Sequence, residues 1–276
     1  MDAQQRKQMI QTAFDTVAEG YDHPSLPFFR QTAQQICKHL SPEPNARWLD
    51  VATGTGVMAL EAARHLSAGS VVGVDLSDGM LRQARAKAQA QRLHNVTFRQ
   101  MDADDLDFPA DHFDIVTCSF GLFFMEDMEG AMRRLARTVK PGGQIAISSF
   151  TETAFSPFAP AFLSLYEAFG KQAPPLSWKR LANVPVIERI YRAAGITDLV
   201  FHHEPLGYAL QSDQQWWNVV WNAGFRGLLN QLSESEREAF KAQHLHTVRA
   251  LCRQGESWLD TGVIIAVGRK GSASTR

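Results

Sequence analysis

Cysteine and net charge are both scarce in this sequence. Its 276 residues include three cysteines, Cys37, Cys118 and Cys252, whose odd number and wide spacing argue against a disulfide framework and against a cysteine-based metal or redox motif. Lys and Arg total 28 against 29 Asp and Glu, and the resulting formal net charge of −1 offers no basic field to a polyanion. We therefore expect a reducing compartment and no nucleic-acid partner.

Long apolar runs are also missing. No stretch approaches the ~18 apolar residues of a membrane span, and residues 1–11 are polar and charged, without the apolar core of a signal peptide. These absences predict a cytoplasmic protein with no integral membrane contact. The hydrophobic content of 45% is ordinary for a globular protein, so we expect a single domain over residues 1–276.

The most informative segment runs from Trp48 to Gly56. It reads as an apolar strand that leads into an acidic residue, Asp50, and then into two glycines, Gly54 and Gly56, ahead of a helix over 57–66. Glycines at such a turn let the backbone approach a ligand closely. The segment therefore predicts a pocket for a nucleotide-type cofactor.

Two cofactor classes fit this segment. Gly54 and Gly56 followed by Ala59 match the dinucleotide fingerprint, and Asp75 lies about 20 residues further on, where a ribose-binding acid is expected. Asp50, however, would repel a pyrophosphate at the helix N-terminus, whereas it would attract the ammonium and sulfonium groups of S-adenosylmethionine. Charge thus favours S-adenosylmethionine, and an NAD(P)-dependent oxidoreductase is the alternative.

Strand and helix patterns alternate regularly through the first half of the chain. Helices are expected within 5–40, broken near Gly20 and Pro24, and a linker at 41–44 follows. Strands are predicted at 48–52, 70–74, 96–100, 113–118, 144–150, 196–203 and 262–268, and helices at 57–66, 78–91, 127–139, 186–194, 213–231 and 234–253. Such alternation predicts a mostly parallel sheet covered by helices on both faces. A turn is expected at 140–143, and the tail 271–276 is expected to be disordered.

Six motifs in a fixed order give the chain a resemblance to a known family. They begin at Phe14, Leu49, Gly73, Asp102, Ser119 and Val139, and read FDxVAxxYD, LDVATGTG, GVDLS, DAD, SFGL and VKPGG. The chain resembles the class I S-adenosylmethionine-dependent methyltransferases and is similar to the ubiquinone/menaquinone biosynthesis (methyltransferase type 11) group. The resemblance implies a Rossmann-like fold with a seven-stranded, mostly parallel sheet whose last strand is antiparallel. It further implies N-terminal helices (1–45) over the site, a cofactor-binding core (46–150), and sheet completion (151–276) with a helical lid at about 208–258.

Cofactor-binding residues follow from the same motifs. Asp75 closes its strand where its two oxygens can accept bonds from both ribose hydroxyls. The resemblance implies that Asp102 accepts from the adenine amino group and that the Ala103 N–H donates to the ring. Met80 could pad the adenine or belong to the core, and Tyr21 could face the sulfonium or be a core tyrosine. The full expected set is Tyr21, Asp50, Ala52, Thr53, Gly54, Gly56, Asp75, Leu76, Met80, Asp102, Ala103 and Ser119.

No metal is expected at the acidic cluster after Asp102. The sixth and twelfth positions counted from Asp102 are Asp107 and Phe113, where a calcium loop would need glycine and glutamate.

Aromatic residues predict the substrate side of the pocket. The residues expected near the transferable methyl group are Ser119, Phe120, Phe123 and Phe124. The quinone group typically has an Arg-Asn pair at positions 123 and 124, and this difference argues against a quinone precursor as the substrate. Trp217, Trp221 and Phe225 recur at four-residue spacing and share one helix face, which either covers the substrate as a lid or packs in the core.

The predicted reaction is methyl transfer to a small, apolar or aromatic metabolite, leaving S-adenosylhomocysteine. Displacement at a sulfonium needs no covalent residue, only alignment and exclusion of water. A hydroxyl acceptor would benefit from a base, and the available histidines are His202, His203, His244 and His246. The sequence does not choose among these, nor among oxygen, carbon and nitrogen acceptors, and it leaves the oligomeric state open. A non-catalytic S-adenosylmethionine-binding protein is a second alternative.

Overall fold

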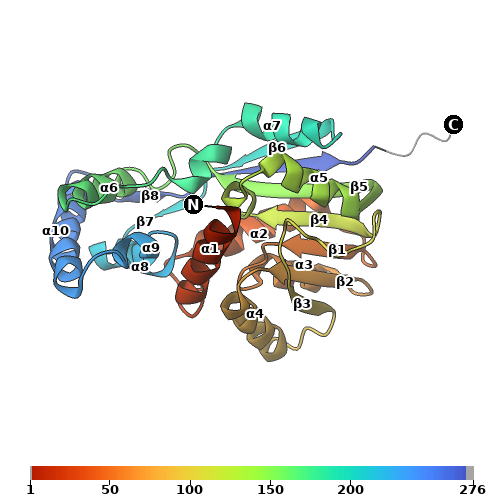
Figure 1. Ribbon diagram of the computed structural model, residues 1–276, viewed down its shortest axis with the longest axis horizontal. Coiled ribbons are helices and arrows are strands. Elements are labelled where there is room, and N and C mark those ends of the chain that lie inside the picture. Colours follow the sequence, from red (N-terminus) through yellow and green to blue (C-terminus); the bar gives the residue numbers. More distant parts are fainter. Residues whose placement is uncertain (1, 272–276) are drawn as a thin grey trace.

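A seven-stranded sheet forms the centre of the computed structural model, which describes residues 2–271 (Figure 1). The strand order is β3-β2-β1-β4-β5-β9-β6, and only β9 runs antiparallel to its neighbours. The strands are β1 (Arg47–Val51), β2 (Ser70–Asp75), β3 (Val96–Gln100), β4 (Phe113–Ser119), β5 (Val139–Phe150), β6 (Asp198–Glu204) and β9 (Val263–Arg269). The predicted fold class is confirmed.

The order of the strands reverses beside β1, and this reversal divides the helices between the two faces. The chain passes from β1 outward to β3 and then returns to β4, so right-handed crossovers place α3 and α4 on one face and α5 on the other. The helices of this layer structure are α2 (Pro27–Leu40), α3 (Val57–His65), α4 (Asp78–Ala90), α5 (Met128–Thr138) and α7 (Val184–Ala193). The switch point between β1 and β4 is where ligands bind in such sheets.

Buried apolar strands explain why the sheet forms the core. Leu49, Val116, Ile145 and Ile265 on four neighbouring strands are fully buried, as expected for strands covered on both faces. Trp48 is buried too, and its indole Nε1 donates to the Thr117 hydroxyl 2.9 Å away.

A largely aromatic part of the hydrophobic core lies beside the sheet. It is built by α6 (Phe158–Ala168), α8 (Asp213–Asn222), α9 (Arg226–Leu229) and α10 (Glu234–Arg253), together with the small pair β7 (Gly207–Ala209) and β8 (Trp258–Asp260). In Figure 1 these elements form a group on the left, and α1 (Ala3–Val17) lies between them and the sheet. The 3-10 turns η1 (Leu122–Phe124) and η2 (Ser177–Leu181) complete the structure.

Several boundaries in the second half differ from those predicted. The prediction of one continuous helix over 213–231 is wrong, because Ala223 adopts an extended conformation and separates α8 from α9. Helix α6 was not predicted, because a stretch rich in phenylalanine and proline gave no clear helical start. Residues 140–143, predicted as a turn, lie within β5, where Gly142 has φ +78°. Of the tail predicted to be disordered, residues 272–276 lie outside the described residues.

Within residues 2–271, no helix is both long enough and apolar enough to cross a membrane.

Candidate functional site

A cavity lies at the carboxyl ends of the central strands. Its walls are the segments that follow β1 (50–55), β2 (75–77), β3 (101–104) and β4 (119–121), and one face of α1 closes it. The cavity volume is about 190 Å³. A cavity that holds a single water molecule needs only about 10–15 Å³. An organic ligand therefore fits here.

The loop after β1 is held in an unusual backbone conformation. Ala52, Gly54 and Gly56 have φ values of +55°, +54° and +82°, a region that favours glycine. The Gly54 N–H donates to Asp75 Oδ2 at 2.8 Å, which ties this loop to the end of β2. Ala52 also restricts the loop after β4, because a Cβ built on Gly121 would stand 2.6 Å from the Ala52 Cβ.

Exchanging each glycine for alanine should separate ligand binding from folding. Both changes carry the cost of a positive φ, about 1 kcal/mol, but a Cβ on Gly54 would meet nothing within 4 Å, whereas one on Gly56 would stand 2.9 Å from Ala84 Cβ. We expect Gly54→Ala, whose methyl group points into open space beside the cavity, to weaken S-adenosylhomocysteine binding more than tenfold. Gly56→Ala should lower the melting temperature further than Gly54→Ala does.

Calorimetric titration and thermal unfolding of both variants measure these effects. If the two variants lose the same affinity and the same stability, the two glycines have no separate roles.

Asp75 lies at the end of β2 and faces the cavity. Its Oδ1 accepts from the Ser77 N–H at 2.9 Å and its Oδ2 from the Gly54 N–H at 2.8 Å. Burial raises the pKa of this carboxyl above its ordinary value, while these N–H groups act in the opposite direction. Each oxygen keeps a lone pair for another donor, so a ligand with two adjacent hydroxyls could be bound here.

Asp50 is almost fully buried beneath the glycine loop. The Thr53 and Thr117 hydroxyls donate to its two oxygens at 2.6 and 2.7 Å, and its exposed fraction is 1%. Burial raises the pKa of Asp50 to about 6 despite these bonds. Asp50 is thus placed to supply negative potential under the loop rather than a free oxygen to a ligand.

The loop after β3 is engaged by α1. Asp102 accepts from Lys7 Nζ at 2.7 Å and, through its other oxygen, from the Asp104 N–H at 2.9 Å; Lys7 also pairs with Asp104. Arg134 Nε donates to the Ala103 carbonyl at 3.3 Å, and no residue among 2–271 accepts from the Ala103 N–H. That N–H is therefore available to a ligand.

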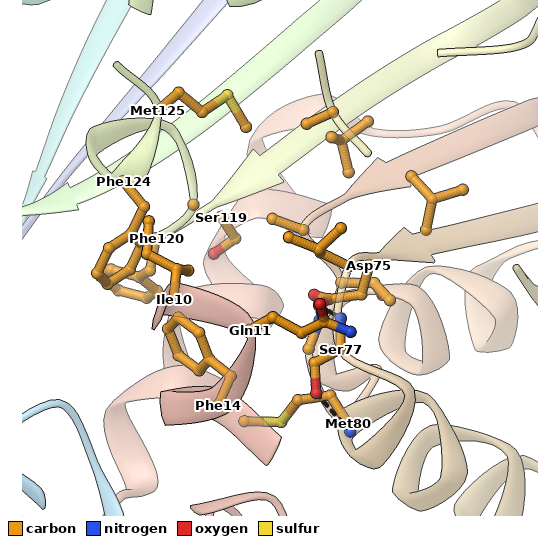
Figure 2. A pocket seen from close by; sticks show the side chains of 18 of the residues that line it. Ile10, Gln11, Phe14, Asp75, Ser77, Met80, Ser119, Phe120, Phe124 and Met125 are labelled. Carbon is orange, nitrogen blue, oxygen red and sulfur yellow. Dashed lines mark hydrogen bonds between the residues drawn. The ribbon is translucent and has the colours of Figure 1, made fainter. Parts of the chain in front are cut away.

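The cavity has one apolar side and one polar side. Figure 2 shows Ile10, Phe14, Phe120 and Phe124 gathered on one side, with Asp75 and Ser77 across the cavity from them. The Phe14 and Phe124 rings meet edge to face with centroids 5.2 Å apart. A planar apolar group would pack well against this side.

Tyr21 and Met80 line the cavity and also contribute to packing. Tyr21 stacks on Phe29 at a centroid distance of 4.9 Å, and Met80 is buried together with Val17 at the end of α1 and Ala18, which follows it. Burial, followed by the charges of Asp75 and Asp22, raises the pKa of the Tyr21 phenol far above its ordinary value, so the phenol stays protonated at neutral pH.

The structure gathers most of the predicted residues at this cavity. The predicted residues that line it are Tyr21, Asp50, Ala52, Thr53, Gly54, Asp75, Leu76, Met80, Asp102, Ala103, Ser119, Phe120 and Phe124. Gly56 is not on the wall, since it forms the N-cap of α3 behind the loop.

Phe123, Trp217 and Trp221 are not brought to the cavity. Phe123 is buried in the core, and Trp217 stacks on Trp221 within the helical group, with Lys241 Nζ 5.4 Å from the centre of the Trp217 ring. The expectation that Trp217, Trp221 and Phe225 share one helix is wrong, because α8 ends before Phe225. None of the four histidines considered as a base lines the cavity.

Sequence reasoning placed the N-terminal helices over the site but did not identify the α1 residues that line the wall. Arg6, Lys7, Ile10, Gln11 and Phe14 all line the cavity, and Phe29, Met101 and Met125 do so from elsewhere. The spacing of positions 7, 10, 11 and 14 marks one face of a helix, but it does not reveal that this face turns toward the cavity. Within residues 2–271, no group of three or more His, Cys, Asp or Glu side chains forms a metal site.

Comparisons with known proteins agree with this geometry. Residues 49–143 match a family model described as a methyltransferase domain. The chain is 33% identical to aklanonic acid methyltransferase DauC of Streptomyces sp. (strain C5), over 75% of this chain and 94% of that protein. It is 27% identical to nocamycin O-methyltransferase of Saccharothrix syringae, over 93% and 96% of the two chains.

Two further comparisons concern the quinone group and the fold. Identity to the ubiquinone/menaquinone biosynthesis C-methyltransferase UbiE of Proteus mirabilis is 31%, over 66% of this chain and 74% of that protein. The crystal structure of YcgJ from Bacillus subtilis superposes with a TM-score of 0.60 at 21% identity, covering 88% of this chain and 99% of that chain. At that identity the structural likeness supports the fold alone.

Proposed function

Because the chain belongs to the class I S-adenosylmethionine-dependent methyltransferases, we propose that it methylates a small, apolar or aromatic metabolite at this cavity. The observation that carries the proposal is the two-sided cavity, where a carboxylate and a glycine loop face a wall of phenylalanine rings. The polar side suits an adenosyl group, and the apolar side suits a flat acceptor.

In this proposal the cofactor lies along the carboxyl ends of β1, β2 and β3. Asp75 accepts from the ribose hydroxyls, and the unpaired Ala103 N–H donates to the adenine ring. Asp50 supplies negative potential near the cationic methionine end. Residues 46–150 thus hold the cofactor, residues 1–45 close it in, and residues 151–276 complete the sheet and add the helical group.

When bound, S-adenosylmethionine supplies an electrophilic methyl group. The protein's part is to hold the acceptor in line with that group and to keep water out. Phe120 and Phe124 follow β4, next to Ser119, and pack toward Phe29 and Phe14 of the N-terminal helices. These rings would fix the plane of an aromatic acceptor.

The relatives support a small-molecule acceptor. The two proteins matched over nearly their whole length are named as methyltransferases of nocamycin and of aklanonic acid. The phenylalanines at 123 and 124 stand where the quinone group typically has an Arg-Asn pair, which argues against a quinone precursor here.

Binding and turnover test this proposal. We expect the purified chain to bind S-adenosylhomocysteine stoichiometrically and to transfer an isotope-labelled methyl group to members of a library of aromatic acids, phenols and quinones, as detected by mass spectrometry. Binding of NAD without S-adenosylhomocysteine would favour the oxidoreductase alternative. Cofactor binding without transfer to any compound would favour a non-catalytic binding protein.

A further inference from the structure

Two neighbouring cations on α1 differ in how they are neutralised. Lys7 pairs with both Asp102 and Asp104 at 2.7 Å. Arg6 also lines the cavity, yet it makes no ion pair within 4.0 Å in the part of the chain that the structure describes. Its one side-chain hydrogen bond runs from Nη2 to the Phe124 carbonyl at 3.4 Å. The guanidinium of Arg6 thus lies beside the aromatic wall with most of its donors unused.

The surroundings of Arg6 contain more positive than negative charge. Arg180 lies nearby, and its donors are used on the carbonyls of Phe123 and Met125, both at 2.8 Å, and of Glu126 at 3.0 Å. Burial lowers the pKa of Arg180, and the charge of Arg6 lowers it further, while Glu126 acts in the opposite direction. Glu126 is exposed. Next to Phe124, an anion would therefore meet the cations Arg6 and Arg180 and the single exposed carboxylate of Glu126.

Most groups on the cavity wall that could take a proton from an acceptor are already engaged. No histidine lies among the described wall residues, and the Tyr21 phenol stays protonated. Both oxygens of Asp50 accept from hydroxyl groups, and Asp102 and Asp104 are paired with Lys7. Asp75 is assigned to the ribose, which leaves Glu126, a wall residue that is exposed to solvent. An acceptor that arrives already ionised needs none of these groups.

We propose that the acceptor is an aromatic oxyanion, a carboxylate or an ionised enol, and that Arg6 holds its charge and sets the preference of the enzyme for it. This inference rests on the proposed function. The oxyanion's electron pair forms the new O–CH₃ bond while the S–CH₃ pair returns to sulfur, so both charges disappear and no proton moves. Arg6 acts as a specificity-determining residue because it binds the acceptor and takes no part in bond exchange.

Matched pairs of test compounds examine the charge preference. Anthraquinone-2-carboxylate is compared with its carboxamide, and 2-hydroxy-1,4-naphthoquinone, which is ionised at neutral pH, with its methyl ether. Affinities are measured by fluorescence titration at saturating S-adenosylhomocysteine. We expect the wild-type chain to bind at least one anion about tenfold or more tightly than its neutral partner. The pair that shows the preference identifies which oxyanion is accepted.

Variants of Arg6 test the assigned residue. Arg6→Gln should weaken the preferred anion about 10- to 100-fold, as expected for loss of a charge-assisted hydrogen bond, and leave the neutral partner and S-adenosylhomocysteine unchanged. Arg6→Lys should restore part of the loss. Arg253→Gln, which removes an exposed arginine at the end of α10, is the matched control and should change nothing.

The outcomes separate this inference from the proposed function. It is overturned if anion and neutral partner bind equally, if neither anion binds while S-adenosylhomocysteine does, or if Arg6→Gln weakens both members of a pair alike. Failure of the wild-type chain to bind S-adenosylhomocysteine would instead contradict the proposed function.

Discussion

Asp75→Ala is expected to weaken S-adenosylhomocysteine binding about 10- to 100-fold, as for the loss of buried charge-assisted hydrogen bonds. In the proposal both carboxylate oxygens accept from the ribose. They also accept from the Gly54 and Ser77 N–H groups, so the alanine variant loses the ligand contacts and the arrangement of the loop together. Isothermal titration calorimetry measures the affinity.

Two further variants define what Asp75 contributes. Asp75→Asn keeps one acceptor oxygen and removes the charge, so its affinity should fall between those of wild type and Asp75→Ala. Asp78→Ala removes a partly exposed acid three residues later, which pairs with Arg82 on α4 at 2.8 Å, and should leave the affinity unchanged. Unchanged binding in Asp75→Ala would remove Asp75 from the site.

Lowering the pH from 7.5 to 5 is expected to reduce the free energy of unfolding by about 2 kcal/mol through His244. The free energy changes by about 1.4 kcal/mol per pH unit wherever the unfolded chain carries one proton more than the folded chain. His244 on α10 is fully buried among the rings of Phe162 and Phe240, and its Nε2 accepts from Trp216 Nε1 at 2.7 Å. Burial lowers the pKa of His244 from 6.5 to about 4.

The sign follows from which state binds the proton. Above pH 6.5 the histidine is neutral in both states and contributes no pH dependence. Between pH 6.5 and 4 the unfolded chain is protonated at His244 and the folded chain is not, so stability falls as the pH falls, and the loss is complete below about pH 4. Urea unfolding at a series of pH values measures this loss.

Comparison with variants is needed because other groups titrate in the same range. Asp50, with its pKa raised to about 6, acts with the opposite sign, since its proton favours the folded state. His244→Gln keeps an acceptor for Trp216 but cannot titrate, so its stability should fall less toward pH 5 than that of wild type. His246→Gln alters an exposed histidine on the same helix and should behave as wild type. Equal slopes in wild type and His244→Gln would contradict the assignment.

The first half of the fold could be predicted because its signals are local. Strands β1 and β4 are short and largely apolar, and α4 and α5 begin at recognisable caps, such as Ser77, whose hydroxyl accepts from the Met80 N–H. The second half could not be predicted as well. Nothing in the four-residue spacing of Trp217, Trp221 and Phe225 reveals that Ala223 breaks the helix between them. Their packing depends on rings from α6 and α10, which are distant in sequence.

Some residues of the candidate site could likewise be predicted from the sequence, and others could not. Motif residues such as Gly54 and Asp75 could be predicted because the turn and the strand end place them directly. Arg6 and Lys7 could not, because their position over the cavity depends on how α1 docks. That docking uses contacts distant in sequence: Asp15 accepts from the Ser77 hydroxyl at 2.6 Å, and Lys7 reaches Asp102.

The short distance between Ala52 and Gly121 limits which substitutions position 121 can accept. A side chain at 121 would collide with the methyl group of Ala52 and with Cys118 Sγ, 2.9 Å away. A substitution of Gly121 alone should therefore not be tolerated. A change of Ala52 to glycine would relieve one of the two collisions and would also ease the backbone strain of residue 52, whose φ is +55°. A side chain at 121 should therefore be tolerated only in sequences where positions 52 and 118 have both changed.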